Sequence, residues 1–187
     1  MKAALVNALL FQAGWLICVL GAAYQRPLAG SLVALGIIAW HLSRAVRPRR
    51  EAWLIAIAGA TGAVWDSLLV SLKLLEYASG TLVAGTAPYW IVVMWMLFAT
   101  TLNVSLRWFK QHLILAVPVG AVAGPAAYYA GYSLGGVYLP DPFLALAALS
   151  AGWAVLLPIM LRTAVRLDGF PAPGLTAGHL SARVNHA

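Results

Sequence analysis

The chain of 187 residues is 63% hydrophobic and only 9% charged, with a mean hydropathy of +0.86. Soluble domains are about half apolar and a quarter charged, so this composition excludes a soluble enzyme. The net charge of +7 comes from short clusters of Lys and Arg between apolar segments. That layout is typical of membrane topology signals, and we expect an integral membrane protein that binds no nucleic acid.

The apolar segments predict an all-α fold, a polytopic membrane bundle of six transmembrane helices. An apolar stretch of about 20 residues crosses the hydrocarbon core as a helix. Basic residues follow the second, fourth and sixth segments, so the positive-inside rule places both termini in the cytoplasm (N-in/C-in). The predicted helices cover residues 3–24, 28–44, 52–76, 89–106, 112–134 and 142–162. Residues 1–166 would form the transmembrane domain, and residues 167–187 a flexible cytoplasmic tail.

The first predicted helix carries two side chains able to hydrogen-bond from one face. Gln12 and Trp15 are three residues apart, which places them on the same side of a helix. After the second helix comes a compact basic loop containing Arg44, Arg47, Arg49 and Arg50. This loop either anchors the topology or binds anionic lipid head groups.

The third predicted helix contains Asp66, an acid inside an otherwise apolar stretch. For a helix over 52–76, Asp66 lies within roughly 3 Å of the hydrocarbon centre. Insertion of an acid there costs about 3 kcal/mol, so donors on neighbouring helices must compensate for it. Gly59 and Gly62 precede Asp66 at helical spacing and predict a face on which another backbone approaches closely.

Two interpretations of Asp66 remain open. It is either a hydrogen-bonded structural acid or a catalytic acid/base, proton-transfer or ligand-anchoring group, because intramembrane acids mark functional sites. The fifth segment adds Gly120, Gly124 and Pro125, which predict close helix packing and freed backbone carbonyls.

Polar and aromatic side chains from several helices fall at similar predicted depths. They predict either an apolar pocket with a few orienting groups or a core held by interhelical hydrogen bonds. The candidate ligand-binding residues are Gln12, Trp15, Trp95, Asn103 and Tyr128. The spacing of His and Cys residues implies no metal site, and no motif implies a cofactor.

Several short patterns resemble the DUF2878 family along essentially the whole chain up to the tail. They are Asn7-x4-Gln12-x2-Trp15, Gly62-x3-Asp66, Trp90-x4-Trp95-x2-Phe98 leading into Asn103-x-Ser105, and Gly124-Pro125-x2-Tyr128-x2-Gly131. The resemblance implies a small protein of the bacterial inner membrane with undetermined activity. Genes of the family neighbour genes for fatty-acyl modification, which implies a lipid-related role.

These observations favour a lipid-associated enzyme or accessory factor for acyl-chain modification, with Asp66 as acid/base or polar anchor. Gln12 and Tyr128 would orient its carboxyl group. The expected partners are membrane lipids and lipid-modifying enzymes. A small proton-coupled transporter and a non-catalytic structural or assembly subunit are the alternatives.

Overall fold

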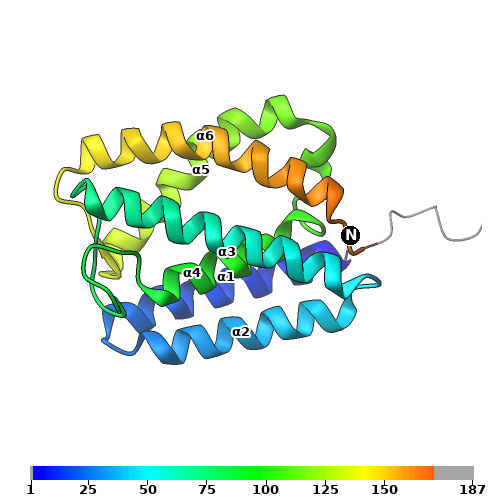
Figure 1. The fold of residues 1–187 in the computed structure, drawn as a ribbon, viewed down its shortest axis with the longest axis horizontal. Coiled ribbons are helices and arrows are strands. Elements are labelled where there is room, and N and C mark those ends of the chain that lie inside the picture. Colours follow the sequence, from blue (N-terminus) through cyan, green and yellow to red (C-terminus); the bar gives the residue numbers. More distant parts are fainter. Residues whose placement is uncertain (1, 171–187) are drawn as a thin grey trace, which may run out of the picture.

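The computed structural model describes residues 2–170, which are mostly helical, as predicted (Figure 1). A short 3-10 helix, η1, follows the fourth α-helix, and two short strands lie in the loops. The elements are α1 (Lys2–Ala23), α2 (Pro27–Arg44), α3 (Pro48–Ser71), β1 (Glu76–Tyr77), α4 (Tyr89–Leu102), η1 (Arg107–Gln111), α5 (Leu113–Ser133), β2 (Val137–Tyr138) and α6 (Pro142–Arg166).

The helices form two packed units. Helices α1 to α4 pack against one another, whereas α5 packs mainly against α6. Between the units, the indole rings of Trp95 and Trp153 stack with their centroids 4.7 Å apart. The start of α1, the α2–α3 turn, η1 and the end of α6 lie at one end of the bundle, which we call the N-terminal end (Figure 1).

Small residues set the distance between α5 and α6. A Cβ atom added at Gly120 would lie 2.2 Å from the backbone oxygen of Trp153, and one added at Gly124 would lie 2.2 Å from its ring. Pro125 has no N–H to donate to the carbonyl group one turn earlier, that of Ala121. The hydroxyl group of Ser150 on α6 donates to this oxygen at 2.8 Å, so the proline creates an acceptor for the neighbouring helix.

The two strands join the loops at the opposite end of the bundle. Strand β1 pairs antiparallel with β2, with Tyr77 opposite Val137. Because β1 follows α3 and β2 follows α5, the pair ties the two helical units together. It also fixes the position of Tyr77, whose ring packs edge-on against Trp90 with centroids 5.6 Å apart.

Three predicted helix ranges required correction. The range 52–76 is replaced by Pro48–Ser71, because Pro48 occupies the first turn, where its missing N–H is harmless, and because Lys73 adopts a left-handed φ of 59°. The range 89–106 ends at Leu102, and 142–162 extends to Arg166. The other three helices match their predicted ranges to within one residue at each end.

Within residues 2–170, four helices are long and apolar enough to cross a membrane: α1, α3, α5 and α6. Helix α4 has 14 residues and rises about 21 Å, less than the hydrocarbon thickness of about 30 Å. The membrane character of the chain agrees with its composition. Six crossings and the N-in/C-in orientation stay predictions.

The contact between α5 and α6 gives a first testable prediction. Gly120→Ala should lower the free energy of unfolding by about 1–3 kcal/mol, because the added methyl group meets backbone rather than a movable side chain. Gly36→Ala on α2 is the control, since a Cβ there has nothing within 4 Å. Thermal unfolding in detergent measures both, and equal midpoints for Gly120→Ala and the unchanged protein would contradict the packing argument.

Candidate functional site

The carboxyl group of Asp66 is fully buried and accepts hydrogen bonds from three side chains. Its Oδ1 accepts from the hydroxyl groups of Tyr77 at 2.5 Å and Tyr128 at 2.7 Å. Its Oδ2 accepts from the indole N–H of Trp95 at 2.7 Å, and Asp66 itself is 0% exposed. We call these four residues the Asp66 group.

Each donor of the Asp66 group comes from a different element. Trp95 belongs to α4, Tyr128 to α5 and Tyr77 to β1. Trp95 can approach because Gly62 lies one turn before Asp66, and a Cβ at Gly62 would lie 2.1 Å from the Trp95 ring. At Gly59, a Cβ would meet Met96 of α4 at 2.8 Å. The small-residue face of α3 therefore lies on α4 and directs Asp66 to the indole N–H.

The hydrogen bonds of the Asp66 group are suited to holding α3, α4, α5 and β1 together. Burial, together with the Asp66 carboxylate, raises the pKa of Tyr77 well above its usual value, so this hydroxyl group stays neutral and donates. A carboxylate has about four acceptor positions, and three are occupied here. The carboxyl group has no exposed surface, and its hydrogen bonds join it to three other elements of the fold.

The predicted pocket is only partly assembled. Trp95 and Tyr128 contact Asp66, but Gln12 is exposed on the surface of α1. Trp15 is half-buried against the main apolar core, and Asn103 lies at the other end of α3, bound to Glu51. Asp66 itself lies five residues before the end of α3, roughly 10 Å from the middle of that helix, and its depth in a membrane stays a prediction.

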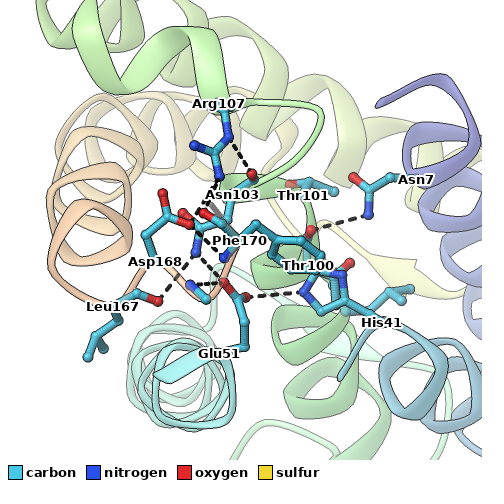
Figure 2. A network of polar contacts seen from close by, with 12 residues as sticks. Asn7, His41, Glu51, Thr100, Thr101, Asn103, Arg107, Leu167, Asp168 and Phe170 are labelled. Carbon is cyan, nitrogen blue, oxygen red and sulfur yellow. Dashed lines mark hydrogen bonds and ion pairs between the residues drawn. The ribbon is translucent and has the colours of Figure 1, made fainter. Parts of the chain in front are cut away.

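A second buried acid, Glu51, lies in the first turn of α3, at the N-terminal end of the bundle, and Figure 2 shows its polar contacts. Its Oε1 accepts from the side-chain amide of Asn103 at 2.6 Å and from the backbone N–H of Gly169 at 2.9 Å. Its Oε2 lies 3.1 Å from Nε2 of His41. Glu51 is 0% exposed. We call Glu51, His41, Asn103 and Gly169 the Glu51 group.

Ion pairs to Asp168 extend the Glu51 group toward the surface (Figure 2). The guanidinium group of Arg107 donates to Asp168 at 3.0 Å, and the ammonium group of Lys110 donates to its other oxygen at 2.7 Å. Lys110 also donates to the side-chain oxygen of Asn103 at 2.7 Å. Residues 167–170, the first four of the predicted tail, are thus fixed against α3 and η1. Residues 171–187 of that tail lie outside the described part of the chain.

Sequence reasoning missed Tyr77 and the whole Glu51 group apart from Asn103. Arg107 and Lys110 belong to the basic residues that follow the fourth predicted helix, which were interpreted as topology signals. One available signal was the spacing on α3: Glu51 continues the face of Ile55, Gly59, Gly62 and Asp66 in steps of three and four residues. That spacing marks an acid that turns toward the bundle.

The family with the description "Protein of unknown function (DUF2878)" matches residues 4–159. The chain belongs to the DUF2878 family. The matched segment includes Asp66 with its three donors and Glu51 with His41 and Asn103, and it ends before Asp168 and Gly169. No curated protein and no solved structure matches this DUF2878 chain.

The shared acceptor in the Asp66 group gives a second prediction. Tyr77→Phe and Tyr128→Phe should each cost about 1–2 kcal/mol of unfolding free energy, because Oδ1 keeps one donor in each variant. The double variant leaves Oδ1 without a donor and should cost more than the sum. Tyr129→Phe, which changes an exposed ring on α5, is the control. Chemical unfolding in detergent measures the unfolding free energies of the two single variants and the double variant. If the two single losses simply add up to the loss in the double variant, a shared acceptor is refuted.

The Asp168 ion pairs give a third prediction. In Asp168→Ala, tryptic cleavage after Arg166 should accelerate roughly fivefold, the effect of losing about 1 kcal/mol of local stability. Asp141→Ala removes an acid from the other end of α6 and should leave this cleavage unchanged. The rate is followed by mass spectrometry of the released peptide. Equal rates in the two variants would show that the ion pairs do not hold residues 167–170.

Proposed function

We propose that this DUF2878 protein is a multi-pass protein of the bacterial inner (cytoplasmic) membrane that acts as a non-catalytic accessory factor in membrane-lipid modification. Its partners would be membrane lipids and the enzymes that modify acyl chains. Asp66 would serve as a packing anchor rather than as an acid or base. Four long apolar helices support the membrane part of this proposal. The lipid part is supported by the gene neighbourhood with fatty-acyl modification that the resemblance to the DUF2878 family implies.

The complete burial of Asp66 is the observation that carries the non-catalytic part. A general acid or base must come within about 2.6–3.2 Å of the atom whose proton it transfers. The atoms at hydrogen-bonding distance from the Asp66 carboxyl group, 2.5–2.7 Å away, all belong to protein donors: Tyr77, Tyr128 and Trp95. A substrate would have to displace them and break the contacts that join α3, α4, α5 and β1.

The placement of the two buried acids favours the accessory role over proton-coupled transport. Glu51 and Asp66 lie fifteen residues apart on α3, or roughly 22 Å along its axis. The buried positions between them are apolar or glycine: Leu54, Ile55, Ala58, Gly59 and Gly62. A proton relay needs polar groups at hydrogen-bonding intervals, and this face of α3 supplies them only at its two ends.

Lipid profiling tests the proposed function and separates it from catalysis. We expect deletion of the gene to change the acyl-chain composition of the membrane. Asp66→Asn should reduce the amount of folded protein several-fold, because burial of a mispaired polar group costs about 1–3 kcal/mol, while the lipid effect per molecule stays unchanged. Tyr129→Phe is the control for expression.

Two results would reject parts of the proposal. A normal amount of Asp66→Asn protein combined with the lipid profile of the deletion strain would assign a chemical role to Asp66. Identical lipids with and without the gene would remove the lipid role altogether.

A further inference from the structure

An apolar groove runs along the outer surface between α1 and α2. It is lined by Leu10 of α1 and by Val33, Gly36, Ile37 and Trp40 of α2. Gly36 forms its open floor, since an added Cβ atom would have no neighbour within 4 Å. In a membrane-spanning bundle such an outward-facing apolar groove is in contact with lipid acyl chains.

The groove leads directly to positive charge at the N-terminal end of the bundle. Val33, Ile37, Trp40 and Arg44 are separated by four, three and four residues, so they follow one face of α2. Arg44 is exposed one turn beyond Trp40. Lys2, at the start of α1, is exposed at the same end, because α1 and α2 are adjacent and run in opposite directions.

No surface acid offsets this charge nearby in the sequence. Arg47, Arg49 and Arg50 follow Arg44 and are all exposed, and the one acid among residues 1–65 is Glu51. Glu51 is turned inward and bound to His41, Asn103 and Gly169. Because this carboxylate turns inward, the exposed charges among residues 2–65 are all basic, and basic side chains attract anions.

We propose that the groove between α1 and α2 binds an anionic phospholipid, with one acyl chain along Leu10, Val33, Gly36 and Ile37 and the phosphate group at Arg44. Trp40 lies between the two parts, at the level where aromatic rings meet the head-group region. The guanidinium group of Arg44 can donate two hydrogen bonds to a phosphate. This assignment names the lipid class for the proposed lipid-associated function, but it rests on the groove and not on any lipid-modifying partner.

The charged end of the groove favours a lipid over a second protein helix. A partner helix would bury the apolar lining equally well, but it would need its own acids opposite Arg44 and Lys2. An anionic phospholipid supplies both the chain and the charge in one molecule, and it is present at high concentration around the protein. Basic side chains at the cytoplasmic membrane surface each strengthen the binding of such lipids.

Gly36→Leu provides a direct test, since a Cβ atom there has nothing within 4 Å, so a leucine side chain can extend into the groove and also favours the helix. Native mass spectrometry of the full-length protein in detergent, titrated with phosphatidylglycerol, measures the apparent affinity. Gly36→Leu should abolish the preferential binding. Arg44→Gln should weaken it about fivefold, the effect of one basic contact. The matched controls are Ala126→Leu and Arg162→Gln, at exposed positions of α5 and α6. Both should bind phosphatidylglycerol as the unchanged protein does.

Competing ligands identify which part of the lipid is recognised. Phosphatidylcholine should compete poorly, which separates anionic head groups from acyl chains alone. Glycerol phosphate without acyl chains should compete poorly as well, which separates a lipid from a free phosphate. Equal affinities for Gly36→Leu and Ala126→Leu would overturn the proposal. Self-association that is lost in Gly36→Leu, with lipid binding unchanged, would replace the lipid with a second copy of the chain. Because the titration uses purified protein, its failure is independent of the lipid profiles of living cells.

Discussion

A carboxyl group inside a membrane-spanning helix must find donors within the protein, since lipid offers none. Helix α3 carries two such groups on one face, Glu51 and Asp66, with apolar residues and glycines between them. The glycines bring α4 close, and Trp95 and Asn103 of the α4 region then reach the two acids. The requirement to satisfy two acids therefore fixes the position of α3 on α4 at both ends of the interface.

The same acids attach the second helical unit to the first. Tyr128 of α5 donates to Asp66 at one end, and Gly169, just after α6, donates to Glu51 at the other. Between these points the stacked rings of Trp95 and Trp153 fill the interface. The indole N–H groups of Trp65 and Trp153 have no hydrogen-bond partner within residues 2–170, so these two rings contribute apolar packing. The polar contacts define the placement of α5 and α6, and the aromatic contacts fill the space.

Much of this arrangement was accessible from the sequence, because depth and spacing constrain a membrane helix strongly. Asp66 was recognised as an inward-facing acid, and Trp95 and Tyr128 as candidate neighbours. Tyr77 was missed because the apolar run of α3 continues past Ser71, while the actual helix end depends on the pairing of β1 with the distant β2. Arg107 and Lys110 were interpreted as topology signals, and Glu51 lies just outside the predicted helix 52–76. Residue type and spacing do not reveal whether such a charge turns outward to water or inward to a partner 118 residues away.

The contact between Glu51 and Gly169 has a consequence for the order in which the protein matures. Glu51 is translated early, whereas Gly169 follows α6. During synthesis the carboxyl group of α3 enters the membrane with one of its donors still unmade. Assembly of the early helices is therefore completed by a late segment of the same polypeptide, and a ribosome that stalls before residue 169 leaves Glu51 without the N–H of Gly169.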